Sequence, residues 1–161
     1  MSTERSGRRE LDGTGLSIAV ARSRFNDEVT ARLAAAAQAT LRHRGVRDDD
    51  IHLVECPGAF ELPLVAKYLA ESGEFDAIIA LGAVIRGETD HYDLVARAAA
   101  EGIARVTLET GVPVIFEVLA TSTREQAESR AGGALGNRGE DAALAAVEMA
   151  RLVAGLGRRA R

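Results

Sequence analysis

The sequence of 161 residues has few of the residues on which several fold classes depend. It contains no tryptophan, two tyrosines and four phenylalanines, so aromatic residues make up 4% of the chain. Antiparallel sandwiches and jelly rolls normally use more aromatic and β-branched residues than this. The scarcity argues against those all-β folds, whereas the many alanine, leucine and valine residues suit helices packed on a sheet.

The sequence also has only one cysteine, no long apolar run and no net positive charge. The single cysteine, Cys56, excludes an internal disulfide and a cysteine-based metal cluster, and it is typical of a protein of the reducing cytoplasm. No apolar run reaches the roughly 18–20 residues that cross a bilayer, and residues 1–15 lack the apolar segment of a secretory signal. The formal charge of −4 does not favour nucleic-acid binding. We therefore expect a cytoplasmic globular protein with no membrane and no nucleic-acid partner.

Short apolar runs alternate with longer stretches of helical periodicity, in which apolar residues recur every three or four positions. The alternation predicts a single α/β domain, a three-layer α/β/α sandwich of flavodoxin-like type with a four-stranded parallel sheet. We expect a flexible segment over 1–15, the domain over 16–157 and a basic tail over 158–161. The expected strands are 16–21, 51–54, 77–81 and 114–119, and the expected helices begin near Asn26, Leu62, His91, Thr123 and the end of 132–139.

The carboxyl ends of the expected strands are where a ligand of such a sheet binds. Most of the few aromatic residues fall at or near that edge. Any one of them is more often a core residue, but their clustering favours a site for a planar ligand, which needs faces to stack on. They are Phe25, Phe60, Tyr92 and Phe116.

The segment 87–91 has the features of an anion site. Gly87 lets the backbone approach a ligand closely, and Thr89 or Asp90 can cap a helix that begins near His91. The free N–H groups of a helix N-terminus bind anions, so phosphate is the expected ligand. Histidine is the residue type most often used as a catalytic acid or base, and His91 is the best candidate for that role here.

Several familiar motifs are missing. The sequence has no GxGxxG after a strand and no GxxxxGK[ST], so dinucleotide and P-loop sites lack support. It has no HExxH and no paired Cys/His spacing, so no metal is expected. The glycine-rich residues 132–139 lie between two expected helices, which predicts a flexible joint. Cys56 has no identifiable histidine partner and is a weak nucleophile candidate.

Six motifs, in order and at the right spacing, resemble the lumazine synthase (6,7-dimethyl-8-ribityllumazine synthase) family. The resemblance covers about residues 16–156, nearly the whole chain. The motifs are Arg24-Phe25-Asn26, Pro57-Gly58-Ala59-Phe60-Glu61-Leu62-Pro63, Gly82-Ala83-Val84-Ile85-Arg86-Gly87-Glu88-Thr89-Asp90-His91-Tyr92, Glu125-Gln126-Ala127, Arg130-Ala131-Gly132 and Gly136-Asn137-Arg138-Gly139.

The resemblance implies a transferase of riboflavin biosynthesis. Such an enzyme condenses 5-amino-6-(D-ribitylamino)uracil with 3,4-dihydroxy-2-butanone 4-phosphate to 6,7-dimethyl-8-ribityllumazine, and releases phosphate and water. It uses no metal and no organic cofactor.

The resemblance also implies a role for each matching residue. His91 would move protons, Phe25 would stack on the pyrimidine, and the residues matching Phe116 and Arg130 come from a neighbouring subunit in the family. Ribitylaminouracil would be bound by Phe25, Ala59, Phe60, Glu61, Ala83, Val84, Ile85 and Phe116, of which residues 83–85 would use main-chain groups. Butanone phosphate would be bound by Gly87, Glu88, Thr89 and Arg130.

Some positions depart from the family pattern. Glu117 stands where a glycine usually follows the phenylalanine, which would place a carboxylate close to the ring site. Ser129 replaces an acidic residue, Arg138 replaces a lysine, and residues 120–122 replace a threonine-rich stretch. Glu117 and Ser129 motivate a second hypothesis, a weakened paralogue that binds flavin or lumazine or acts mainly as a shell protein. A monomeric flavodoxin-like binding module is a third.

The resemblance further implies assembly. Family members form homopentamers, and some assemble twelve pentamers into an icosahedral shell of 60 subunits. Residues 132–139 carry no insertion, which permits such a shell. The N-terminal segment would add a strand to a neighbour's sheet.

Overall fold

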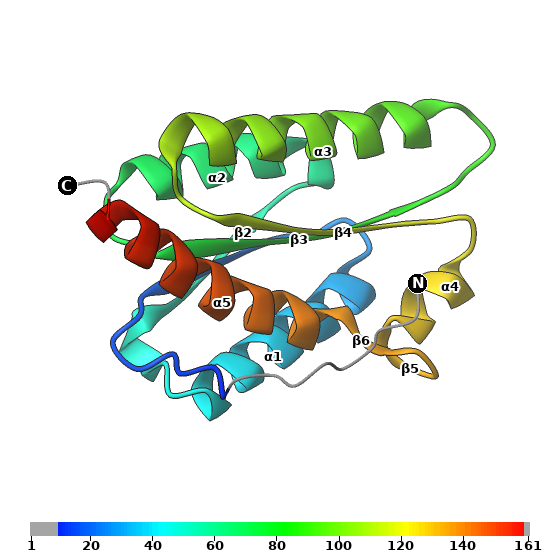
Figure 1. Cartoon of the computed structure of the whole chain (residues 1–161). Helices are drawn as coiled ribbons and strands as arrows, with labels where there is room; N and C mark the ends of the chain where they lie inside the picture. The colour runs from blue at the N-terminus through cyan, green and yellow to red at the C-terminus, as the bar shows by residue number, and fades with distance from the viewer. Residues whose placement is uncertain (1–9, 160–161) are drawn as a thin grey trace.

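A parallel sheet forms the middle layer of the molecule (Figure 1). The structure is a computed structural model that describes residues 10–159. Its four strands lie in the order β2-β1-β3-β4 and are all parallel. The expected three-layer α/β/α architecture is confirmed. The strands are β1 (Ile18–Ser23), β2 (Ile51–Cys56), β3 (Ala77–Ile85) and β4 (Val114–Thr121).

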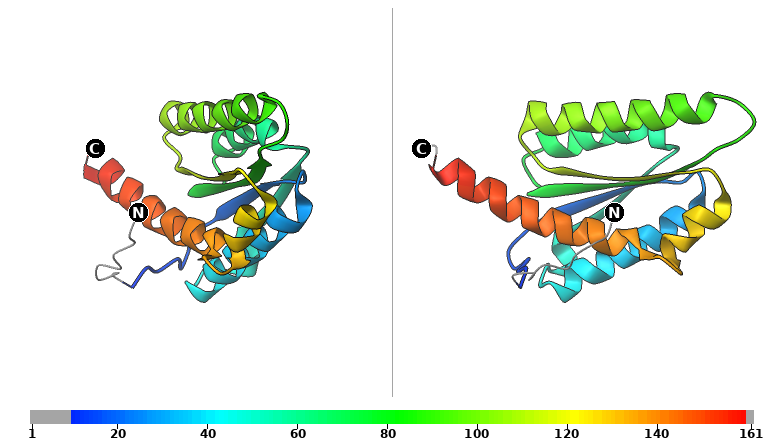
Figure 2. Two further views of the ribbon diagram at one scale, coloured as in Figure 1. Left: turned by 90° about the vertical axis from the view of Figure 1, so that its right-hand side faces the viewer. Right: turned by 45° about the vertical axis from the view of Figure 1, so that its right-hand side comes forward.

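Helices cover both faces of this sheet (Figures 1 and 2). α2 (Leu62–Glu71) and α3 (His91–Thr110) pack on one face. α1 (Asp27–His43), the short α4 (Arg124–Ser129) and α5 (Arg138–Arg159) pack on the other. Two short 3-10 helices, η1 (Asp48–Asp50) and η2 (Ala59–Glu61), flank β2.

Two apolar cores, one on each face, hold the layers together. Successive strand residues point to opposite faces, so Ile78 packs with Leu62 and Ile103 below α2 and α3. Its neighbour Ile79 packs with Leu33 against α1 and α5. All five side chains are at most 2% exposed, and burying each contributes roughly 1.5–3 kcal/mol before the entropy cost of ordering. β3 therefore lies inside the sheet because its apolar run can be covered on both faces.

The predicted helix limits hold where local signals are strong. The helix expected from His91 is α3, and Gly111 follows its last residue with φ of 72°. The cap expected for the short helix is present, since the Thr123 hydroxyl oxygen accepts a hydrogen bond from the Gln126 N–H at 3.2 Å.

The prediction of a flexible joint over residues 132–139 is wrong. The segment is an antiparallel hairpin of β5 (Ala131–Gly133) and β6 (Gly136–Asn137), and α5 begins directly after it. Gly136 has φ of 81°, a left-handed conformation that suits a tight turn and costs glycine little. The Arg138 N–H donates to the Arg130 carbonyl at 2.8 Å, which closes the hairpin.

The structure describes only part of each end of the chain. Residues 1–9 and 160–161 lie outside the described residues, and with them most of the segment expected to add a strand to a neighbour and the end of the expected basic tail. Within the rest, the backbone carbonyls of Asp12 and Thr14 accept hydrogen bonds from the Arg151 side chain at 3.0 and 2.6 Å. No helix in residues 10–159 is long and apolar enough to cross a membrane.

Candidate active site

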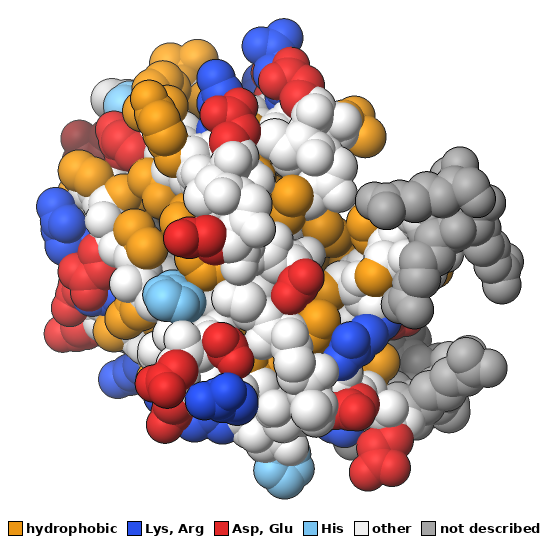
Figure 3. All heavy atoms as spheres, turned by 90° about the vertical axis from the view of Figure 1, so that its left-hand side faces the viewer, with side chains coloured by type: hydrophobic (Ala, Val, Ile, Leu, Met, Phe, Trp, Pro, Cys, Tyr) orange, Lys and Arg blue, Asp and Glu red, His pale blue; other side chains and the backbone are white. Residues whose placement is uncertain are grey.

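A cleft of about 710 Å³ lies beyond the carboxyl ends of β1, β2 and β3. This is the end of the sheet at which parallel α/β proteins bind ligands. Figure 3 shows the opposite end of the molecule, where acidic and basic side chains surround scattered apolar ones. The cleft is lined by Phe25, Pro57, Gly58, Ala59, Phe60, Glu61, Ala83, Val84, Ile85, Gly87, Thr89, His91, Tyr92 and Val95.

The loops after β1 and β2 leave the sheet side by side. The Arg24 N–H donates to the Cys56 carbonyl at 2.8 Å, and the Phe25 N–H donates to the Pro57 carbonyl at 3.0 Å. These two bonds tie the loops together just beyond the ends of the two strands. Phe25 and the residues after Pro57 are therefore held on the same side of the cleft.

Asn26 ties the loop after β1 to the end of β3. It has φ of 59° and ψ of 48°, the left-handed region that asparagine enters more readily than most residues. It precedes α1 as expected, but its side chain makes no capping hydrogen bond there. The Asn26 Nδ2 instead donates to the Ala83 carbonyl at 2.9 Å. Asn26 therefore holds the N-cap position of α1 through its backbone, while its side chain joins two walls of the cleft.

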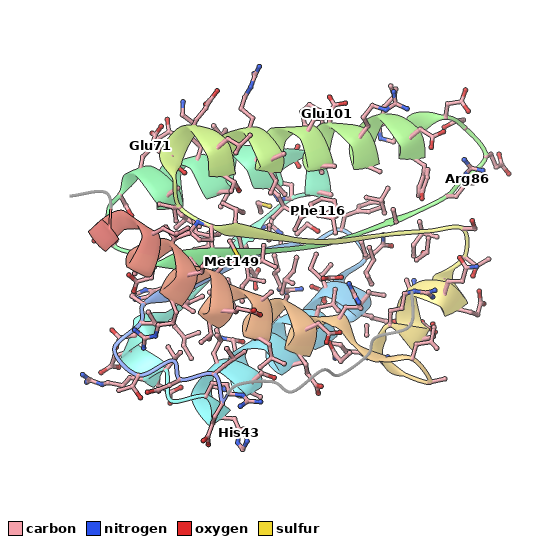
Figure 4. All side chains as sticks on the ribbon, viewed as in Figure 1. His43, Glu71, Arg86, Glu101, Phe116 and Met149 are labelled. Atoms are coloured by element: carbon pink, nitrogen blue, oxygen red, sulfur yellow. The ribbon has the colours of Figure 1, made fainter. Side chains whose placement is uncertain are left out.

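Two phenylalanine rings of the cleft are largely uncovered. Phe25 is 72% exposed and Phe60 is 62% exposed. Exposed rings inside a cleft offer stacking faces to a planar ligand. Phe116 is different, because it lies in the first half of β4 on the side of α2 and α3 and does not line the cleft (Figure 4).

The start of α3 closes one end of the cleft. Gly87, Thr89 and His91 line it, whereas Glu88 does not. The Thr89 hydroxyl oxygen accepts a long hydrogen bond of 3.4 Å from the His91 N–H. Of the two predicted caps, Thr89 is therefore the one used, and the Asp90 side chain makes no capping bond.

Arg86 supports this end of the cleft from outside (Figure 4). Its N–H donates to the Thr121 carbonyl at 2.9 Å, so the chain stays paired with β4 just beyond β3. Its guanidinium carbon lies 5.3 Å from the centre of the Tyr92 ring, and its Nη2 lies 3.6 Å from an Asp93 carboxylate oxygen. These contacts link the loop 86–90 to the first turn of α3.

Cys56 lies buried behind the cleft. Burial, and then the negative charge of Glu61, raise the pKa of its thiol. The thiol donates to the Gly58 carbonyl at 3.5 Å. A raised pKa keeps the sulfur protonated near neutral pH, which agrees with the weak nucleophile expected from the sequence.

Arg130 and Glu117 lie away from the cleft. Arg130 follows the last residue of α4, and its Nη1 donates to the Gln126 carbonyl at 2.8 Å and to the Ser129 hydroxyl at 3.3 Å. Glu117 follows Phe116 in β4 and points to the other face of the sheet, where it pairs with Arg138. The prediction that the Glu117 carboxylate lies close to the ring site is wrong, because it is turned away from Phe116.

The structure adds residues that the sequence analysis did not assign to the site. Pro57 and Gly58 follow β2 directly, and Val95 lies one helical turn after His91. Strand-end position and helical spacing were the signals that point to them. In the part of the chain that the structure describes, no three His, Cys, Asp or Glu side chains are grouped to hold a metal ion.

A comparison with protein families supports the motif resemblance. The model of the 6,7-dimethyl-8-ribityllumazine synthase family matches residues 15–154 of the chain. The match includes every strand of the sheet and every residue that lines the cleft.

Proposed function

The chain belongs to the 6,7-dimethyl-8-ribityllumazine synthase family, and on this premise we propose that its cleft condenses 5-amino-6-(D-ribitylamino)uracil with 3,4-dihydroxy-2-butanone 4-phosphate. The product is 6,7-dimethyl-8-ribityllumazine, with phosphate and water released. One observation carries the proposal. The cleft gathers all the residues that the resemblance assigns to the substrates except Glu88, Phe116 and Arg130.

The uracil substrate would occupy the β1, β2 and β3 side of the cleft. The exposed ring of Phe25 offers a stacking face for the pyrimidine. Glu61 and its neighbours in η2 supply acceptors for the ribityl hydroxyls. The main chain of 83–85 ends β3 at the cleft and can pair with the uracil edge, and the Asn26 bond holds Ala83 in place.

The phosphate of the second substrate would lie at the N-terminus of α3. This helix of 20 residues presents the positive end of its dipole to the loop 87–89. Gly87, Glu88 and Thr89 would bind through main-chain groups. Arg130 of a neighbouring copy would add a bidentate pair, a geometry that arginine favours for phosphate.

His91 would move the protons. Imine formation, phosphate loss, ring closure and dehydration each transfer protons, and His91 lines the cleft as the first residue of α3. A positioned acid or base contributes roughly 10²–10⁴-fold to such steps. Holding the two substrates together supplies much of the remaining acceleration.

The proposal includes assembly in the cytoplasm as a homopentamer, with a shell of 60 subunits permitted by the short hairpin 131–137. It is supported by the position of Phe116 and Arg130, which lie outside their own chain's cleft and are free to complete another. The alternative is a weakened paralogue that binds flavin or lumazine or acts mainly as a shell protein, which Glu117 and Ser129 motivate. The Glu117 carboxylate faces α5, so it does not alter the cleft of its own chain.

A direct assay tests the proposed function. The purified protein is incubated with both substrates, and lumazine and phosphate are measured by chromatography, with each substrate omitted in turn. We expect lumazine and phosphate in equal amounts, only when both substrates are present. Folded, assembled protein that forms no lumazine would refute the proposal, and tight flavin binding in that case would favour the paralogue.

A further inference from the structure

Glu117 and Arg138 form an ion pair between β4 and the start of α5. The Arg138 Nε lies 2.9 Å from Glu117 Oε1, and Nη2 lies 3.5 Å from Oε2. The Glu117 side chain is 11% exposed. Both residues are departures from the family pattern, and here they bind each other. The Arg138 side chain is 45% exposed, so its charge stays hydrated when the Glu117 charge is removed.

Arg138 also fixes the hairpin that follows Arg130. Its own N–H donates to the Arg130 carbonyl at 2.8 Å, and the Leu135 N–H donates to the Ser129 carbonyl at 2.9 Å. The backbone of Arg130 is thus bonded to the residue whose side chain holds Glu117. Moving Arg138 would move the Arg130 backbone with it.

The other side of the hairpin is anchored on α1. The Asn137 Nδ2 donates to the Arg32 carbonyl at 3.3 Å. At Gly139 a Cβ atom would lie 2.1 Å from the Leu33 carbonyl oxygen, so the first turn of α5 is in close contact with α1. The hairpin 131–137 is therefore held between α1 and β4, and Glu117 provides the β4 attachment.

We propose that Glu117 is a positioning residue for the phosphate-binding arginine. Through its ion pair with Arg138, it holds the hairpin 131–137 and sets the position from which Arg130 reaches the phosphate of a substrate in a neighbouring cleft. The inference rests on the proposed function, because the role of Arg130 belongs to that proposal. The inference gives the Glu117 carboxylate a role in substrate binding, although it takes no part in the chemistry.

A merely structural role for Glu117 predicts a loss of global stability and an equal effect on both substrates when its charge is removed. Burial raises the pKa of the Glu117 carboxyl more than Arg138 lowers it, so its charge is held at a cost. Glu117→Gln keeps the shape and removes the charge, and we expect little change in global thermal stability. The effect should appear in the binding of one substrate.

The test separates the KM values of the two substrates. For Glu117→Gln we expect KM for the butanone phosphate to rise about tenfold, the lower end of the loss of a charged hydrogen bond, and KM for ribitylaminouracil to stay within about twofold. Arg138→Gln should behave similarly, and the double variant should be no worse than the poorer single variant. Glu109→Gln, which removes an exposed pair with Arg105 on α3, is the matched control and should change neither KM.

Equal rises in both KM values, or additive losses in the double variant, would overturn the positioning role. Hydrogen exchange supplies a second readout that needs no activity. The Leu135 and Arg138 amides should exchange faster in Glu117→Gln than in Glu109→Gln, and equal exchange would overturn the proposal. Wild-type protein that forms no lumazine would refute the proposed function instead, while the exchange result would still decide whether Glu117 anchors the hairpin.

Discussion

Replacing Asn26 tests how the cleft is held together. Asn26→Ala removes the 2.9 Å hydrogen bond to the Ala83 carbonyl, a loss of about 1 kcal/mol. Alanine must also adopt φ of 59°, which costs about another 1–2 kcal/mol. Asn26→Gly loses the same bond without that penalty, although glycine adds roughly 0.5–1 kcal/mol of chain entropy to the unfolded state.

The two variants should therefore reverse the usual order of stability between alanine and glycine. In most positions a glycine variant is less stable than an alanine variant, but here we expect the alanine variant to be equal in stability or lower by up to about 1.5 kcal/mol. In a chain of this size 1 kcal/mol corresponds to about 2–4 °C in Tm. Thermal unfolding at one fixed protein concentration measures this, since assembly makes Tm depend on concentration. Both variants should also lose kcat/KM, and an alanine variant clearly more stable than the glycine variant would refute the reasoning.

Three other predictions concern side chains in or near the proposed site. His91→Ala should lower kcat by roughly 10²–10⁴-fold with little change in Tm, because His91 is exposed; an unchanged kcat would contradict its role. Arg130→Ala should raise KM for the butanone phosphate, and Arg130→Lys should restore it poorly because lysine lacks the bidentate fork. Full recovery with lysine would argue against that geometry. The buried Cys56 should react with iodoacetamide at pH 8 more slowly than in the urea-unfolded chain, since burial raises its pKa; equal rates would contradict this.

Much of the fold was predictable because its signals are local. The apolar run of β3 can be covered only inside a sheet, and the capping sequence from Thr123 marks a helix start without reference to the rest of the chain. Strand order places the carboxyl ends of β1, β2 and β3 next to one another. The rule that ligands bind at those ends then located the cleft.

The remaining features depend on contacts between distant residues. The hairpin 131–137 is held by bonds from Asn137 to α1 and from Arg138 to β4, and glycine content alone predicts mobility there. The bond from Asn26 to Ala83 joins residues 57 positions apart. Glu117 is an exception, because strand alternation alone places it opposite Phe116 and could have corrected the expectation.

Subunit mixing tests most directly that the cleft is a synthase site completed by a neighbouring copy. His91→Ala and Arg130→Ala proteins, each nearly inactive with saturating uracil substrate and limiting butanone phosphate, are unfolded together and reassembled in equal amounts. Each site takes His91 from one subunit and Arg130 from the neighbouring subunit. In an equal mixture each of these residues is native in half of the subunits, so about one quarter of the sites should contain both native residues. We predict recovery of about one quarter of wild-type activity. Mixed assemblies of native size with no more activity than the separate variants would contradict the account.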